Sequence, residues 1–149
     1  MSKVTAAAER LIDTPTEKVQ VVVSDYENRP KILTDHYRDY VVVEGGFGAG
    51  TTAAWKLHAT SKRVRDVRAA VTEPTPGTLV ETDENSSMVT TWTVRESGDG
   101  TVVRIETTWD GATGVAGFFE RTFAPRGLKA IYKGVLDNLA TVSAAEASK

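Results

Sequence analysis

Histidine and cysteine, the side chains that most often perform nucleophilic, acid–base and metal chemistry, are scarce in this sequence. The chain has two histidines, His36 and His58, and no cysteine. The lack of cysteine excludes a disulfide framework, thiolate zinc sites and a cysteine nucleophile. Two histidines leave little for imidazole ligation of a metal, so we expect neither a metal nor a cofactor.

The positions of the two histidines do not indicate a catalytic site. His58 alternates with Trp55 and Leu57 in a stretch of period two, which places its side chain on the outer face of a predicted strand. A catalytic histidine would have to face the interior of the fold. His36 lies beside Tyr37 in a predicted connection, where it is either a surface residue or part of a cavity rim.

Acidic side chains are scattered, whereas glycoside hydrolysis needs two carboxylates at a defined separation in one cleft. The candidates are Glu81, Glu84, Glu106 and Asp110. Glu106 shares its parity with Arg104, so we expect it on the outer face, in cross-strand ion pairs with the strand around residues 63–68. The interior wall is therefore expected to be nearly free of His, Asp and Glu.

Two other motifs have a structural and a functional interpretation. The glycine cluster at residues 45–50 lacks the Gly-Lys-Ser/Thr ending of a phosphate-binding loop and precedes a strand, so it predicts a turn. Phe47 within that turn could act as an apolar gate. The basic run from Lys62 to Arg68 falls on both faces of its strand, and it is either a solvated surface or an attraction for a phosphate or acidic partner.

Tyr132 is the polar residue with the most suggestive position. It borders an apolar stripe of the C-terminal helix, and its hydroxyl could meet a ligand or a threonine such as Thr90 or Thr107. The alternative is a structural tyrosine. The aromatic residues Phe118, Phe119 and Phe123 either close one end of a cavity or anchor the segment before the helix.

A sheet-rich middle and a helical C-terminal end must position these residues, which gives an α+β fold class. Thr14 is a predicted helix cap, with Pro15 in the first helical position. Thr and Val favour strands and gather in the middle of the chain. The predicted strands are 3–12, 40–44, 52–60, 62–72, 78–83, 88–95 and 101–109, and the predicted helices are 15–25, 29–34, a turn or two within 115–123, and 126–145.

Composition limits the classes of protein. A chain of 149 residues is long enough for one domain with a full core, so we expect a single domain over residues 1–149. A net charge of −2 argues against nucleic acid as a partner. No apolar run approaches the roughly 20 residues that span a bilayer, so we expect no stable membrane insertion. We see no secretory signal and expect a cytoplasmic protein.

Three stretches of the sequence resemble a known family. They are Ile12–Val19 at the first strand-to-helix junction, Ser24–Pro30 between the short helices, and Gly48–Thr51 before the strand that carries Trp55. On these stretches the chain resembles the polyketide cyclase/dehydrase type of small bacterial protein within the START and Bet v 1-like (SRPBCC) superfamily. The resemblance implies a helix-grip fold, in which a curved antiparallel sheet of about seven strands surrounds a long C-terminal helix and encloses an apolar cavity. Two short helices follow the first strand.

The residue pattern supplies a candidate wall for such a cavity. The inward positions of the sheet and helix, with the aromatic segment between them, give the candidate ligand-binding residues Trp55, Leu57, Val67, Ala69, Met88, Thr90, Trp92, Ile105, Thr107, Trp109, Phe119, Leu128, Ile131, Tyr132 and Val135. All three tryptophans belong to this set. A closed core requires the same residues, because alternation does not distinguish a filled interior from a hollow one.

We expect the protein to bind or transport a small hydrophobic molecule such as a lipid, a polyketide or an aromatic compound. An enzyme of the polyketide aromatase/cyclase or dehydratase type is the alternative, and it would need a general acid or base at the cavity wall. The expected scarcity of such groups favours binding over catalysis. A third alternative is a protein-partner module, which an exposed apolar patch of several hundred Å² would favour.

Overall fold

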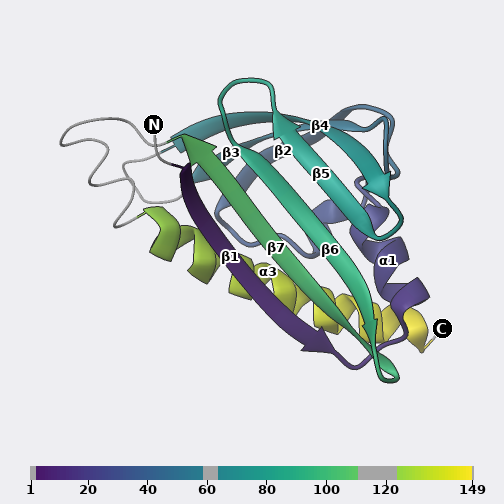
Figure 1. Cartoon of the computed structure of the whole chain (residues 1–149). Coiled ribbons are helices and arrows are strands. Elements are labelled where there is room, and N and C mark those ends of the chain that lie inside the picture. Colours follow the sequence, from purple (N-terminus) through teal and green to yellow (C-terminus); the bar gives the residue numbers. More distant parts are fainter. Residues whose placement is uncertain (1–2, 59–63, 111–123, 149) are drawn as a thin grey trace.

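The computed structural model describes residues 3–58, 64–110 and 124–148. One antiparallel sheet of seven strands, in the order β1-β7-β6-β5-β4-β3-β2, forms the body of the molecule (Figure 1). The strands are β1 (Lys3–Ile12), β2 (Tyr37–Glu44), β3 (Thr52–His58), β4 (Val64–Thr75), β5 (Thr78–Asp83), β6 (Val89–Ser97) and β7 (Gly100–Asp110). The helices are α1 (Thr16–Ser24), the short 3₁₀ helix η1 (Arg29–Lys31) and α3 (Ala124–Ala147).

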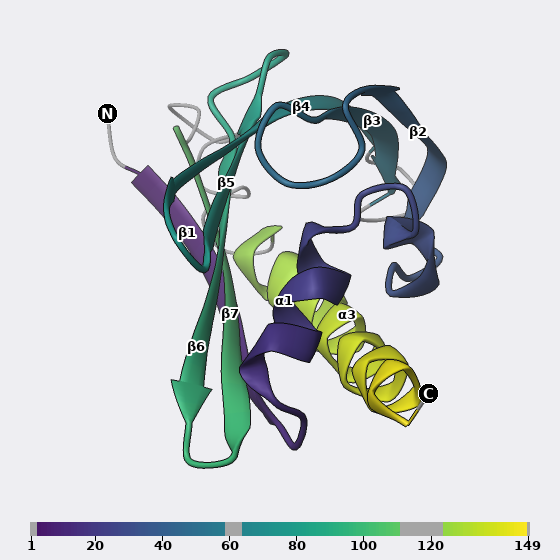
Figure 2. The same ribbon diagram turned by 90° about the vertical axis from the view of Figure 1, so that its right-hand side faces the viewer.

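The sheet curves around α3, as Figure 2 shows when the molecule is viewed along that helix. At 1.5 Å per residue the 24 residues of α3 extend about 36 Å. Its buried residues recur at steps of three and four, because that spacing keeps them on one helical face. This arrangement confirms the expected α+β helix-grip fold.

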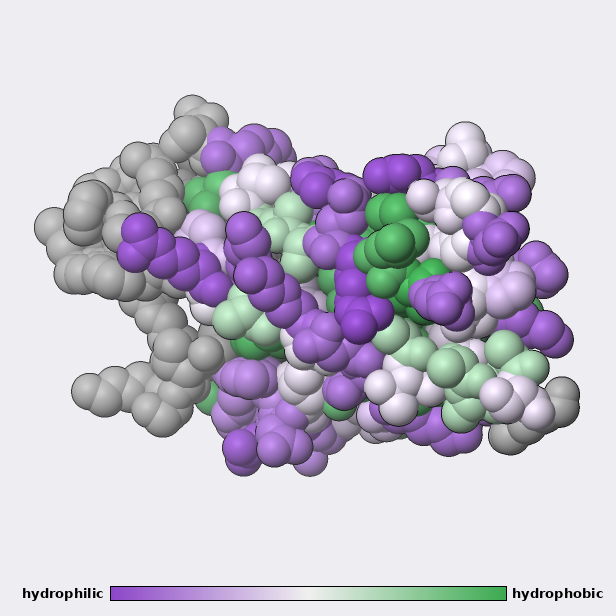
Figure 3. Space-filling view, turned by 90° about the horizontal axis from the view of Figure 1, so that it is seen from below, coloured by the Kyte–Doolittle hydropathy of each residue, from purple (hydrophilic) through white to green (hydrophobic). Residues whose placement is uncertain are grey.

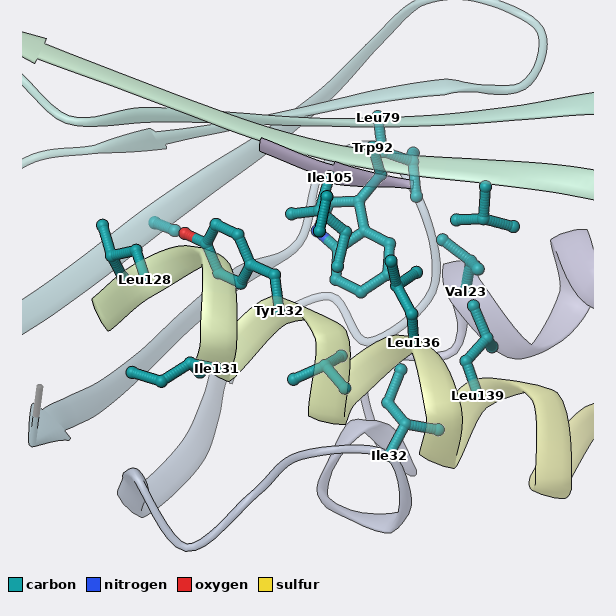
Figure 4. Close-up of a cluster of buried hydrophobic side chains, with 14 of the residues drawn as sticks. Val23, Ile32, Leu79, Trp92, Ile105, Leu128, Ile131, Tyr132, Leu136 and Leu139 are labelled. Atoms are coloured by element: carbon teal, nitrogen blue, oxygen red, sulfur yellow. The ribbon is translucent and has the colours of Figure 1, made fainter. Parts of the chain in front are cut away.

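The core lies between α3 and the concave face of the sheet (Figure 4). Leu128, Ile131, Leu136 and Leu139 are buried on the helix, and Ile105 is buried opposite them on β7. Burying a side chain of this size contributes roughly 1.5–3 kcal/mol. The side of the molecule seen in Figure 3 is mostly hydrophilic, with hydrophobic residues gathered in small areas.

Several helix boundaries in the structure differ from those predicted from the sequence. The cap of α1 is Pro15 and makes no side-chain hydrogen bond, so the expected cap at Thr14 is wrong. Thr14 is buried, and its carbonyl oxygen accepts a 2.7 Å hydrogen bond from the Thr101 hydroxyl of β7. The second short helix is limited to Arg29–Lys31, and the predicted helical turn within 115–123 lies outside the described residues.

Strand β2 begins at Tyr37 rather than at residue 40, and the reason is a bulge. The pairing with β3 shifts between Arg38 and Val41, and Asp39 adopts a φ of 54°. An extra residue in one strand reverses the alternation of side chains beyond it. Tyr37 and Tyr40 therefore both line the interior, although their positions differ by an odd number of residues.

The connection between β2 and β3 is the turn that the glycine cluster predicts. Gly45, Gly46, Gly48 and Gly50 all have positive φ, which glycine adopts without a steric penalty. The carbonyl of Gly46 accepts from the Tyr26 amide at 2.9 Å, so this turn holds the chain just after α1. No helix among the described residues is long and apolar enough to cross a membrane.

Candidate functional site

A small cavity lies between the sheet, the segment from η1 to β2, and α3. About 20 Å³ of it is open to the centre of a water molecule, and a single water needs roughly 10–15 Å³ by the same measure. The cavity in this conformation therefore holds about one water. It is lined by Arg29, Leu33, Tyr37, Tyr40, Trp55, Leu57, Glu81, Met88, Thr90, Trp92, Ile105 and Tyr132.

One end of the cavity carries a buried ion pair. Nη1 of Arg29 donates to Oε2 of Glu81 at 3.1 Å, and the two side chains are 4% and 5% exposed. The hydroxyl of Tyr26 donates to the same carboxylate oxygen at 2.6 Å. Nη2 of Arg29 donates to the carbonyl of Val23. This pairing compensates two charges that would otherwise be costly to bury.

Two aromatic rings contact the guanidinium of Arg29. Its central carbon lies 4.1 Å from the ring centre of Tyr26 and 4.5 Å from that of Trp92, distances typical of cation–π contacts. Burial lowers the pKa of Arg29, but Tyr26 and Glu81 outweigh this effect and raise it overall. Arg29 thus remains a fixed positive charge.

The local sequence explains how Arg29 turns inward. Asp25 accepts hydrogen bonds from the backbone amide and the side-chain amide of Asn28, at 3.3 and 2.7 Å. Such an aspartate-centred turn reverses the chain after a helix. Residues Ser24–Pro30, on which the family resemblance partly rests, thus place Tyr26 and Arg29 beneath the sheet.

Buried donors without an acceptor gather among these lining residues. Arg29 Nε, Trp55 Nε1 and Trp92 Nε1 have no hydrogen-bond partner among the described residues. Trp109 Nε1 and Ser143 Oγ share this state but belong to residues outside the lining. A buried donor without an acceptor costs free energy, and it is a group that a ligand can satisfy.

Tyr132 of α3 forms a second polar cluster with two threonines. Its hydroxyl lies 2.5 Å from Oγ1 of Thr107, which in turn lies 2.7 Å from Oγ1 of Thr90. The expectation that this hydroxyl meets a threonine is confirmed. Burial raises the pKa of Tyr132 to about 12, although the threonine hydrogen bonds lower it in part. The phenol is therefore neutral at physiological pH.

Three aromatic side chains close the cavity on its β2 side. Tyr40 stacks on Trp55 with ring centres 5.9 Å apart, and Tyr37 packs on the same indole at 6.1 Å. Outside this wall is a surface hollow of about 430 Å³ that Leu33, Tyr37 and Tyr40 also line. Leu33, Tyr37 and Tyr40 thus line both the hollow and the cavity.

The structure brings part of the predicted wall to the cavity. Trp55, Leu57, Met88, Thr90, Trp92, Ile105 and Tyr132 line it, whereas Val67, Ala69, Thr107, Trp109, Leu128, Ile131 and Val135 are buried in the surrounding core. Phe119 lies outside the described residues, as do Phe118 and Phe123. The lining residues that alternation missed are Arg29, Leu33, Tyr37, Tyr40 and Glu81.

The expectation of a wall nearly free of acidic groups is wrong at Glu81. Glu81 shares its parity with Leu79, whose side chain is buried on the same face of β5. The alternation of residues along this strand could therefore have predicted that the Glu81 side chain points inward. Arg29 lacked a comparable signal, because η1 is too short for a periodic pattern and arginine is seldom buried.

The expected partners of Glu106 are also wrong. Glu106 pairs with Arg104 on its own strand at 2.9 Å. β7 lies between β1 and β6, so the strand that contains residues 64–68 is too far away in the sheet to contribute. From that strand, Arg68 pairs with Glu84 at 3.0 Å on the surface.

The remaining candidates lie away from the cavity lining. His58 is on the opposite parity from Leu57, and Nδ1 of His36 is hydrogen-bonded to Oγ1 of Thr34 at 2.9 Å in the turn before β2. Phe47 is 61% exposed, in the glycine-rich turn. Neither histidine belongs to the lining residues.

Comparisons with known proteins agree with this geometry. Residues 3–144 match the family described as polyketide cyclase/dehydrase and lipid transport. The KanY protein, solved by NMR in solution, is 51% identical, with a TM-score of 0.87 over 96% of this chain and 99% of its own. No protein with a curated description matches significantly.

Two more distant structures share the fold. A START superfamily protein from Mycobacterium smegmatis is 14% identical, with a TM-score of 0.72 over 94% of this chain and 98% of its own. The di-domain aromatase/cyclase StfQ of the steffimycin biosynthetic pathway is 12% identical, with a TM-score of 0.75. That match covers 99% of this chain and 53% of StfQ.

Proposed function

Because the chain belongs to the polyketide cyclase/dehydrase and lipid transport family, we propose that it encloses a small hydrophobic molecule between the sheet and α3. The observation that carries this proposal is the cavity itself, whose wall is mostly aromatic and aliphatic but includes buried donors without acceptors. Apolar burial supplies the affinity, and a few polar groups orient the ligand.

Ligand entry requires the cavity to expand, since its present volume accommodates about one water. The side chains of Leu33, Tyr37 and Tyr40 line both the cavity and the outer hollow. We expect rotation of these side chains to join the two spaces. The ligand then lies against Trp55 and Trp92, with one end toward Arg29.

Titration with a neutral apolar fluorophore, N-phenyl-1-naphthylamine, tests the proposal. Ile105→Phe fills the cavity from β7 and is expected to weaken binding at least tenfold, whereas Val43→Phe on the exposed face of β2 leaves it unchanged. Thermal melting verifies that both variants fold. Failure of the wild-type protein to bind the fluorophore, or equal binding by Ile105→Phe, would contradict an enclosed ligand.

A second candidate function is cyclisation or dehydration of a β-keto chain inside the same cavity. The observation that favours it is Glu81, a carboxylate at the wall whose Oε1 accepts no hydrogen bond from the described residues. A carboxylate in that position suits a general base that removes the proton between two carbonyl groups. Glu81→Gln would then bind a diketide thioester but not convert it, as judged by mass spectrometry of the products.

A further inference from the structure

The polar end of the cavity has no net charge, although it contains two ionised groups. We infer that this end selects an uncharged ligand that carries a hydroxyl group, such as a phenol or an alcohol, and that it discriminates against carboxylates. The inference rests on the proposed enclosure of a hydrophobic molecule and specifies the chemistry of its polar end.

The charge balance follows from one contact. Arg29 and Glu81 form an ion pair at 3.1 Å, and both side chains are almost completely buried. The other titratable groups that line the cavity are Tyr37, Tyr40 and Tyr132, and burial keeps all three protonated at neutral pH. A carboxylate that approached Arg29 would therefore meet the carboxylate of Glu81 within the same low-dielectric space.

The guanidinium of Arg29 already has partners within the protein. Its Nη1 and Nη2 atoms are committed to Glu81 and to the Val23 carbonyl. Its central carbon also lies over the rings of Tyr26 and Trp92. Nε has no acceptor in the described ranges of the chain, and each Nη atom keeps one further N–H, so a carboxylate at Arg29 would bind beside the negative charge of Glu81 rather than in place of it.

A hydroxyl group matches what remains unsatisfied. Arg29 Nε, Trp55 Nε1 and Trp92 Nε1 are donors without acceptors among the described residues. Oε1 of Glu81 is an acceptor that receives no hydrogen bond within the described part of the chain, because Tyr26 and Arg29 both bind Oε2. A hydroxyl accepts from the first set and donates to the second, whereas a carbonyl only accepts and a hydrocarbon does neither.

Three probes with the same ring system test this inference: 2-naphthol, 2-naphthoate and 2-methylnaphthalene. Isothermal titration calorimetry at pH 7 measures each affinity for the wild-type protein. We expect 2-naphthol to bind at least tenfold more tightly than either of the others, since each of them leaves polar groups unpaired or adds a second negative charge. This ranking requires no variant and so does not depend on how a substitution affects folding.

A charge-removing variant sharpens the test. Glu81→Gln leaves Arg29 without its counter-charge, so 2-naphthoate is expected to gain at least tenfold relative to 2-naphthol. Glu84→Gln is the matched control, because it changes an acid on the same part of the chain that pairs with Arg68 at the surface, and the ranking stays that of the wild type. Thermal melting with and without probe confirms that both variants are folded.

The outcomes separate the inference from the proposed function. Binding of all three probes with 2-naphthoate equal to or tighter than 2-naphthol overturns the selectivity and leaves the enclosed ligand standing. An unchanged ranking in Glu81→Gln also overturns it. If no probe binds to the wild-type protein, both the proposed enclosure of a ligand and the inferred preference for a hydroxyl group are wrong.

Discussion

Removal of either partner of the Arg29–Glu81 ion pair should destabilise the protein far more than removal of both. Arg29→Met leaves a buried carboxylate without a counter-charge, and Glu81→Gln leaves a buried guanidinium. With side chains 4% and 5% exposed, each single change is expected to cost roughly 3–5 kcal/mol, the range for breaking a buried pair. Arg29→Met also loses its contacts with the rings of Tyr26 and Trp92.

The double variant Arg29→Met/Glu81→Gln contains no buried charge at this place. Replacing a whole buried ion pair with neutral groups is often close to neutral for stability, so the double variant should recover at least about 2 kcal/mol relative to the sum of the single changes. Urea denaturation followed by tryptophan fluorescence and circular dichroism supplies all four free energies of unfolding for the cycle.

Acid provides an internal check on Arg29→Met. The stranded carboxyl of Glu81 takes up a proton more readily in the folded variant than in the unfolded chain, so the free energy of unfolding of the variant falls as pH rises. The stability difference from wild type should therefore narrow between pH 7 and about pH 4.5. Single variants that each cost less than about 1 kcal/mol, or a double variant whose loss equals their sum, would refute the reasoning.

Three other predictions concern the tyrosines and glycines. Burial raises the pKa of all four tyrosines, that of Tyr132 to about 12, so the folded protein retains protons that unfolded tyrosines release near pH 10. Urea denaturation at pH 9, 10 and 11 should show a free energy of unfolding that falls as pH rises. Phenolate absorbance at 295 nm that appears near pH 10 in the folded protein would contradict this prediction. Tyr132→Phe removes the hydrogen bond to Thr107 and should lower the free energy of unfolding, measured by urea denaturation, by about 0.5–1.5 kcal/mol. An unchanged free energy of unfolding would contradict this prediction. Gly45→Ala places a Cβ 2.8 Å from the Gly50 carbonyl oxygen at positive φ and should destabilise the protein by at least about 1 kcal/mol. In Gly127→Ala the new Cβ meets nothing within 4 Å in α3, so this change should stabilise the protein by up to about 1 kcal/mol. Melting temperatures of the two variants that move in the same direction would contradict this contrast.

The sheet and the long helix were predictable because their residues obey one period over many positions. The strand at Lys3–Ile12 and the strand at Thr78–Asp83 have the predicted bounds, and the stripe of α3 begins within two residues of its expected start. Hydrophobic periodicity is averaged over a whole element, so single exceptions do not disturb it.

The candidate site was less predictable, because its residues depart from the hydrophobic periodicity that predicts helices and strands. The bulge at Asp39 turns both Tyr37 and Tyr40 inward, which a period of two cannot predict. Glu81 follows the parity of Leu79 but has the wrong polarity for an inner face. The buried charge of Arg29 is balanced by Glu81, which lies 52 residues away on β5, and no local pattern contains that contact.

The pairing of β1 with β7 has a consequence for synthesis of the chain. Residues Lys3–Ile12 pair with Thr101–Asp110, so β1 is synthesised well before its partner strand β7. At a translation rate of 5–20 residues per second, about 100 residues take roughly 5–20 s to follow. Throughout that interval the nascent chain presents an unpaired strand edge with alternating apolar residues. We therefore expect a chaperone that covers this edge during synthesis to reduce aggregation of the nascent chain.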